Sequence, residues 1–339
     1  MGEQAHHPHK IGKKSVTIAI IGNAIVGSSK LTAFIFTGSA VMLSEFIHSV
    51  ADTFNQLFLF IGIERSHKPA DESFNYGYKN ERFFWSLLSA CGVFFIGAGV
   101  TVYHGFTTLF EPTASHFSGW TIGVLAVSAL LEGFSLFMAI RELRKIAEGE
   151  NIWKFVRHSG DPTLLAIIYE DSAAVVGVFI AAFSLIMVEV TGQPYWDSYG
   201  SILIGVLLGV VAVSLMNINR EYLLGRAIPK HIRKKIYTIL SNQPVVDEVH
   251  DFKTIMITTD GYRVKAEIEI NGHYLAKKIF ESRDFKVEYE DIHDYHDFIE
   301  FCTGFSDEVT RTLGKEIDLL EEKIEDEVPT VQHIDIETN

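Results

Sequence analysis

The feature that most constrains the fold is a succession of six apolar segments between residues 16 and 218. Each is about 20 residues long or longer, the length of a helix that crosses the roughly 30 Å hydrocarbon core of a bilayer. Polar, glycine or proline residues separate the segments. The predicted spans are Val16–Thr37, Ala40–Ile63, Phe83–Leu109, Trp120–Ile140, Thr163–Val190 and Ser198–Ile218. The sequence therefore predicts an α-helical membrane protein with a six-helix bundle.

Outside the spans, lysine and arginine occur on only one side of this bundle, in alternate loops. They lie before the first span, after the second (Arg65 to Arg82) and after the fourth (Arg141 to Arg157), and the three intervening loops contain none. Because cytoplasmic loops carry the excess of basic residues, both termini are expected on the cytoplasmic side. The short polar start, without an Arg-rich presequence, favours a bacterial inner membrane.

Beyond the spans the composition changes to that of a soluble domain. We divide the chain into a polar tail (residues 1–15), a transmembrane domain (16–225) and a cytoplasmic domain (226–339). From Ala227 onwards, 25 acidic residues face 14 basic ones, which disfavours nucleic acid as a partner. Two cysteines exclude a disulfide framework or a thiolate metal cluster.

Periodicity in the last third predicts a small α+β domain of αββαβ order. Alternation of apolar and polar residues is clear in RVKAEIEI, at 263–270. A polar insertion follows, and then a long helix ending near Glu327. The other expected elements are a helix at Lys230–Ser241 and strands at Asp247–Thr258, Tyr262–Ile270 and Val331–Glu337.

The second span contains several ionisable groups. Placing each of them at mid-membrane costs at least about 2.5–3.5 kcal/mol, so their presence requires an explanation. His48 and Asp52 are four residues apart and so share one helical face. An imidazole and a carboxylate at this spacing can ligate one small divalent cation. Glu45, three residues before His48, is a further candidate ligand.

The fifth span carries Glu170 and Asp171, which point about 100° apart on a helix. Acids on two helices at similar depth can complete a four-ligand site. The alternative is that His48 and Asp52 form a hydrogen-bonded pair that only stabilises the bundle, which requires neutralising partners.

Three other intramembrane charges have simpler interpretations. Lys30 is the one obvious base in the spans, and we expect it to snorkel or to pair with an acid. Glu132 is an isolated acid in the fourth span, either a proton relay or a structural hydrogen-bond partner. Asp197 opens the last span, where helix capping is expected.

Several segments, in the same order, resemble the cation diffusion facilitator family, including a branch found in animal mitochondria. The resemblance covers nearly the whole chain after the N-terminal tail. The segments are TGSAVMLSEFIHSVADTFNQ (37–56), ADESFNYGYKNERFFW (70–85), DSYGSILIGVLLG (197–209), EYLLGRAIP (221–229) and PTVQHIDIE (329–337). The resemblance implies a homodimeric, proton-coupled exporter of divalent metal from the cytoplasm.

The family's intramembrane site takes two ligands from the second span and two, four residues apart, from the fifth. By resemblance His48 and Asp52 supply the first pair, and Asp171 supplies one residue of the second pair. The remaining position falls on Ile167, which cannot ligate a metal. Adjacent Glu170 is the expected substitute.

The cytoplasmic domain offers a second set of candidate metal ligands. The densest group is His293 and His296 with Asp294 and Asp297. The alternative for all of them is ordinary solvent exposure. The full set of candidates is His250, Asp251, His273, His293, His296 and His333.

The predicted function is proton-coupled export of zinc, or of another divalent metal such as cobalt, iron or manganese, by alternating access. The partners are the bilayer, the metal and protons, and no cofactor is expected. An enzyme is disfavoured because no nucleophile–base set or phosphate-binding glycine loop occurs. The rival prediction is a non-transporting membrane sensor or scaffold that acts through the cytoplasmic domain.

Overall fold

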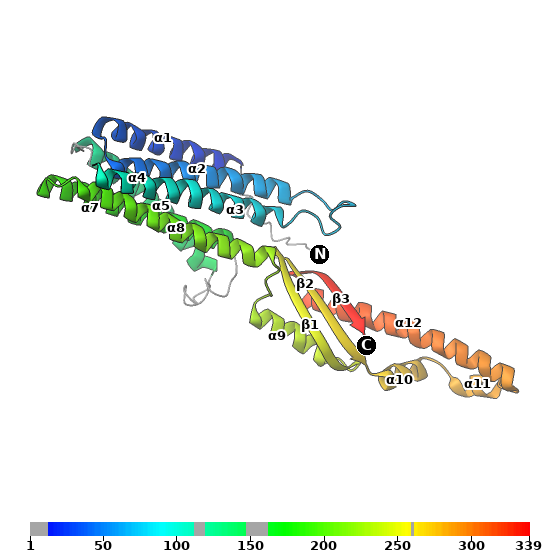
Figure 1. Ribbon diagram of the computed structural model, residues 1–339. Helices are drawn as coiled ribbons and strands as arrows, with labels where there is room; N and C mark the ends of the chain where they lie inside the picture. Colours follow the sequence, from blue (N-terminus) through cyan, green and yellow to red (C-terminus); the bar gives the residue numbers. More distant parts are fainter. Residues whose placement is uncertain (1–12, 112–118, 147–161, 259–260) are drawn as a thin grey trace. The chain divides into compact units, whose positions relative to one another are not determined.

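The computed structural model describes residues 13–111, 119–146, 162–258 and 261–339, with side chains in the first helix described from Ile21 onwards. The chain forms two compact units, one ending at Leu224 and the other beginning at Gly225. The first unit is entirely helical in its described part, and the second combines helices with a three-stranded sheet (Figure 1). A helical membrane bundle followed by a small sheet domain was the predicted fold, and it is confirmed.

Long helices coincide with the six predicted spans. Among the described residues, five helices are long and apolar enough to cross a membrane: α2, the continuous α3–η1–α4, α5, α7 and α8. A sixth helix, α1, has 25 residues and packs against α2. The bounds are α1 Lys13–Thr37, α2 Ala40–Ser66, α3 Glu81–Gly92, η1 Val93–Ala98, α4 Gly99–Phe110, α5 Gly119–Ile146, α7 Pro162–Thr191 and α8 Tyr195–Leu223. The π-helical turn η1 in the third span was not predicted from the sequence.

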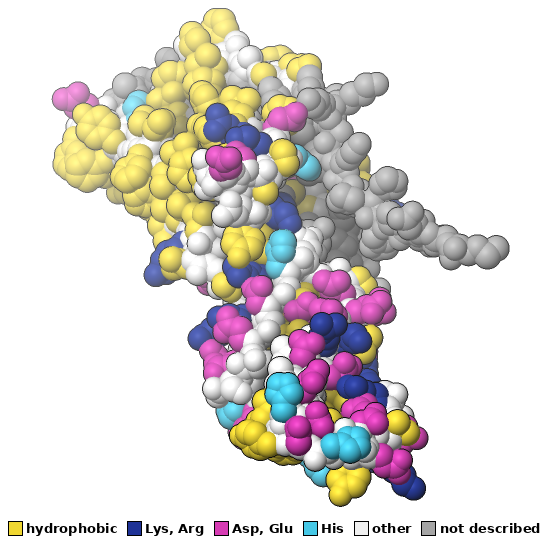
Figure 2. Space-filling model, turned by 90° about the vertical axis from the view of Figure 1, so that its right-hand side faces the viewer, with side chains coloured by type: hydrophobic (Ala, Val, Ile, Leu, Met, Phe, Trp, Pro, Cys, Tyr) yellow, Lys and Arg dark blue, Asp and Glu magenta, His cyan; other side chains and the backbone are white. Residues whose placement is uncertain are grey.

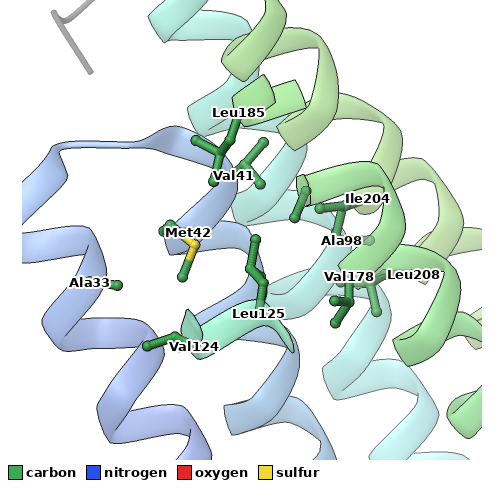
Figure 3. Close-up of a cluster of buried hydrophobic side chains, with 11 residues drawn as sticks. Ala33, Val41, Met42, Ala98, Val124, Leu125, Val178, Leu185, Ile204 and Leu208 are labelled. Atoms are coloured by element: carbon green, nitrogen blue, oxygen red, sulfur yellow. The ribbon is translucent and has the colours of Figure 1, made fainter. Parts of the chain in front are cut away.

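The bundle has a packed apolar centre and an apolar outside. Met42, Leu125, Val178 and Ile204 come from four different helices and meet in one buried cluster (Figure 3). Many large apolar side chains lie outside this cluster and are exposed, and they cover much of the helical unit in Figure 2. Lipid is the solvent for such a surface, so these exposed side chains carry no hydrophobic penalty there.

Close approach between α4 and α8 depends on glycine. A Cβ added to Gly205 would lie 2.6 Å from Cγ2 and 2.9 Å from the backbone nitrogen of Val102. The helices could not come this close with any larger residue, because the obstacle includes backbone. Direct contact between the two helices therefore explains the need for glycine at position 205.

Asp197 has a different capping role from the one predicted. It lies in the first turn of α8, but its carboxylate accepts hydrogen bonds at the start of α2. The donors are Ser39 Oγ at 2.7 Å, the backbone nitrogen of Ala40 at 2.6 Å and that of Val41 at 3.1 Å. The first amides of a helix lack partners within the helix, and here another helix satisfies them. The contact joins the ends of two spans that are far apart in the sequence.

Replacing Asp197 with Ala is expected to destabilise the bundle. Loss of a cap at the upper end of the usual range costs about 2 kcal/mol, which predicts a fall in Tm of roughly 4–8 °C. Thermal unfolding of the purified protein in detergent measures it. Glu189→Ala, which removes an exposed acid near the end of α7, is the matched control and should leave Tm unchanged. Equal Tm values for the two variants would contradict the capping role.

The loop between α2 and α3 is organised by Asp71. Its carboxylate accepts hydrogen bonds from Tyr78 Oη at 2.7 Å and from Lys68 Nζ at 3.1 Å. It also accepts from the backbone nitrogens of Ser73 and Phe74. These donors, Tyr78 first, lower the pKa of Asp71 to about 2. The loop therefore keeps its charged hydrogen-bond acceptor throughout the physiological pH range.

The second unit has the predicted αββαβ order with two additional helices. Strand β2 is central, antiparallel to β1 and parallel to β3. The segment predicted as a polar insertion contains the short helices α10 and α11. The bounds are α9 Lys230–Ser241, β1 Val246–Thr258, β2 Gly261–Ile270, α10 Gly272–Ser282, α11 Phe285–Glu290, α12 Tyr295–Glu327 and β3 Val331–Thr338. Ile236, Val264, Ile268 and Ile324 are fully buried in this unit.

Candidate metal-transport site

Helix α2 places His48 and Asp52 together, as their spacing predicts. The distance from His48 Nε2 to Asp52 Oδ2 is 3.3 Å, and the His48 side chain is buried. Despite this distance, the geometry is not that of a hydrogen bond, and His48 Nε2 has no hydrogen-bond partner. A buried ring nitrogen without a partner beside a carboxylate is suited to bind a cation.

Helix α7 provides two carboxylates with different surroundings. Glu170 Oε2 accepts a hydrogen bond from Asn55 Nδ2 at 2.5 Å, whereas its buried Oε1 has no partner. Asp171 Oδ2 accepts from Ser135 Oγ of α5 at 2.7 Å. Each acid is thus held through one oxygen and keeps the other oxygen for further interactions.

A short hydrogen-bond chain positions Glu170. Ser89 Oγ of α3 donates to Asn55 Oδ1 at 2.7 Å, and the Asn55 amide donates in turn to Glu170. Asn55, Ser89 and Ser135 were not among the predicted site residues. Serines are common in apolar helices, so only the position of Asn55, three residues after Asp52, gave a signal for this network.

The two halves of the site are neighbours. Helix α2 packs directly against α7, and Asn55, three residues after Asp52 on α2, donates directly to Glu170 of α7. These groups are not drawn together to coordination distance. In the described part of the chain, the only three potential ligands whose atoms lie within 4.8 Å of one another are Glu248, His250 and Glu269. Binding of one cation by the whole intramembrane set therefore requires these side chains to move closer together.

Glu45 is placed differently from the other four predicted ligands. Its Oε2 accepts a hydrogen bond from Lys30 Nζ of α1 at 2.7 Å, and Lys30 also binds Glu132 Oε1 of α5 at 3.0 Å. Lys30 therefore pairs with acids inside the bundle, one of the two alternatives predicted for it. The Glu45 carboxylate already has a cation partner.

The histidine-rich segment of the second unit has a structural explanation. Asp294 accepts from the backbone nitrogens of His296 and Asp297, and Asp297 accepts from those of His293 and Asp294. This reciprocal capping box begins α12, and its backbone donors lower the pKa of Asp297. Both carboxylates of the densest predicted cluster thus have another role.

Of the other predicted cytoplasmic ligands, His250 alone is part of a compact group. Its Nε2 lies 3.2 Å from Glu269 Oε2 across the β1–β2 pair, and Glu248 is close to both. Asp251 instead forms an ion pair with Lys253. His273 and His333 belong to no such group among the described residues.

Comparison with known proteins agrees with this geometry. Residues 16–224 match the cation efflux transmembrane domain, which covers all the helices that carry the candidate site. The chain belongs to the cation efflux family. The family and the named relatives are membrane transporters and not enzymes, which agrees with the prediction for this chain.

Members of the cation efflux family with curated names are similar over most of this chain. The mouse proton-coupled zinc antiporter SLC30A9, mitochondrial, is 38% identical over 329 residues, which are 96% of this chain and 58% of that protein. Metal tolerance protein C4 of Arabidopsis thaliana is 37% identical over 336 residues, 96% of this chain and 73% of that protein. The cation-efflux pump FieF of Shewanella oneidensis is 26% identical over 229 residues, 66% of this chain and 71% of that protein. The chain thus spans less than two thirds of the length of the mouse relative.

Proposed function

We propose that this family member is a proton-coupled antiporter that exports zinc by alternating access. The observation that carries the proposal is a pair of buried, unpartnered ligand atoms on two adjacent spans, His48 Nε2 and Glu170 Oε1. Asp52 and Asp171 lie beside them and complete the proposed ligand set. Buried polar atoms are nearly always paired in native proteins, so two exceptions beside two carboxylates support binding of a cation.

Zinc is the proposed cargo because of the mixed donors. One imidazole with carboxylates suits zinc, cobalt or iron, whereas an all-oxygen site suits manganese or magnesium. One named relative supports zinc, since it is called a proton-coupled zinc antiporter, and metal tolerance protein C4 supports a metal cargo without naming which.

Protons drive release in this proposal. Metal ligands bind in their deprotonated forms, so protons compete with the metal at the same side chains. In one conformation His48, Asp52, Glu170 and Asp171 capture the metal. After the bundle opens to the other side, protonation of His48 and a carboxylate displaces the metal, and the protonated carrier returns.

The orientation and assembly of the transporter are part of the proposal. The basic loops support placing both termini and the second unit on the side from which metal is exported. A homodimer and a bacterial cell membrane remain predictions. The mammalian relatives are named as mitochondrial, so expression in its own host with a fluorescent tag would decide the membrane.

Zinc uptake driven by a pH gradient in proteoliposomes tests the function. Vesicles with the purified protein and an internal zinc indicator should accumulate zinc when the lumen is more acidic than the bath, and uptake should stop when a protonophore removes the gradient. Protein-free vesicles control for leak. A membrane sensor would instead bind zinc without gradient-dependent flux, and that result would refute transport.

A further inference from the structure

A buried ion cluster lies beside the proposed site and has no part in the cycle above. Lys30 of α1 donates to Glu45 of α2 and to Glu132 of α5, with distances of 2.7 and 3.0 Å. The side chains are 0%, 1% and 17% exposed, respectively. Charged groups within membrane helices are costly to bury, so a cluster of three points to a function.

Both carboxylates lie one helical turn from the site. Glu45 precedes His48 by three residues on α2. Glu132 precedes Ser135 by three residues on α5, and Ser135 donates to Asp171. Side chains three residues apart on a helix are neighbours, so each acid lies next to one half of the proposed ligand set.

Glu132 also has an acceptor atom to spare, and Glu45 reaches the helix that carries the other half of the site. Glu132 Oε2 is buried and has no hydrogen-bond partner. Glu45 Oε1 lies against α7, where a Cβ added to Gly177 would approach it to 3.0 Å. Carboxylate oxygens are ligands that divalent cations accept readily, so both acids could enter the site if Lys30 released them.

We propose that Lys30 determines the metal selectivity of the transporter by binding Glu45 and Glu132 and keeping them out of the coordination sphere of the cargo. This inference rests on the proposed function. Four ligands that include one imidazole suit zinc, which is usually four-coordinate. Two additional carboxylates would create an oxygen-rich site of higher coordination number, which suits manganese. Lys30 itself touches no metal and is a positioning residue.

Selectivity measured in the same vesicles tests the inference. Lys30→Gln releases both acids, so the ratio of zinc to manganese uptake should fall about tenfold. This is the lower end of the effect on metal affinity or activity when a residue that orients a metal ligand is replaced. The variant with Lys30, Glu45 and Glu132 all replaced by glutamine has no acids to release. Its ratio should return to within about threefold of the wild-type ratio. Lys30→Arg keeps the charge and should keep the wild-type ratio.

A merely structural role for the cluster gives a different pattern, in which uptake of both metals falls together at constant ratio. That result, or the same fall in Lys30→Gln and in the triple variant, would overturn the inference. If Lys30→Gln does not fold, the double variants that also replace either Glu45 or Glu132 each leave one acid released. Both should show a lower ratio than the triple variant, and ratios equal to it would also overturn the inference.

The wild-type measurement separates this inference from the proposed function. If a proton gradient drives no uptake of either metal by the wild-type protein, the proposed function itself is refuted. Wild-type transport with an unchanged ratio in every Lys30 variant would refute the selectivity role alone.

Discussion

Asp52→Asn and Asp171→Asn should each reduce zinc flux at least about 100-fold. The loss should exceed the roughly 10–100-fold effect of replacing a residue that only orients a metal ligand. Each substitution removes a charged oxygen ligand and replaces it with an isosteric amide. The lost group is also a proposed proton carrier, so the defect should persist at saturating zinc. Zinc uptake driven by a pH gradient in proteoliposomes measures the effect, and isothermal titration calorimetry measures the affinity.

The matched control is Glu189→Gln, another acid-to-amide change, located on α7 but exposed and near the end of the helix. It should transport zinc as the wild-type protein does. Thermal unfolding in detergent shows whether each variant is folded. A folded Asp52→Asn or Asp171→Asn protein with wild-type flux would exclude that residue from the site.

Glu170→Gln should weaken zinc binding by at least about tenfold, and a histidine at position 167 should restore part of the loss. Glu170 is proposed to replace the ligand that the family pattern places four residues before Asp171, where this chain has Ile167. Residues four apart share a helical face, so a histidine at 167 would lie next to Asp171. Calorimetric titration of zinc into the double variant Ile167→His/Glu170→Gln tests the exchange.

Two further variants make this test specific. Ile167→Leu/Glu170→Gln changes the same positions without adding a ligand and should bind as weakly as Glu170→Gln. Asn55→Ala should weaken binding less than Glu170→Gln does, because it removes only the amide that orients Oε2. Wild-type affinity in Glu170→Gln would show that Glu170 is not a ligand.

Much of the fold followed from local sequence patterns. The spans could be predicted because the length and hydropathy that a bilayer requires are properties of each segment alone. The alternation of apolar and polar residues in RVKAEIEI likewise predicted the central strand β2. The π-helical turn η1 could not be predicted, since it depends on how the third span packs on its neighbours. The helices α10 and α11 were missed because the segment that contains them was predicted as a polar insertion.

The candidate site was predicted to the extent that it lies on single helices. His48 and Asp52 share a face of α2 by spacing alone, and Glu170 and Asp171 are adjacent on α7. The sequence by itself thus determined which ionisable groups enter the membrane, because any such group must be accounted for there. It could not determine their partners, since these come from other helices.

Only the tertiary structure decided how the intramembrane charges are distributed. It assigned Lys30 to Glu45 and Glu132, which are 15 and 102 residues away, and Asp197 to the start of α2, more than 150 residues away. The same long-range packing leaves His48 Nε2 and Glu170 Oε1 without hydrogen-bond partners. A helix defines which face a side chain occupies, but the neighbouring helices determine whether its charge is neutralised or remains available to a cation.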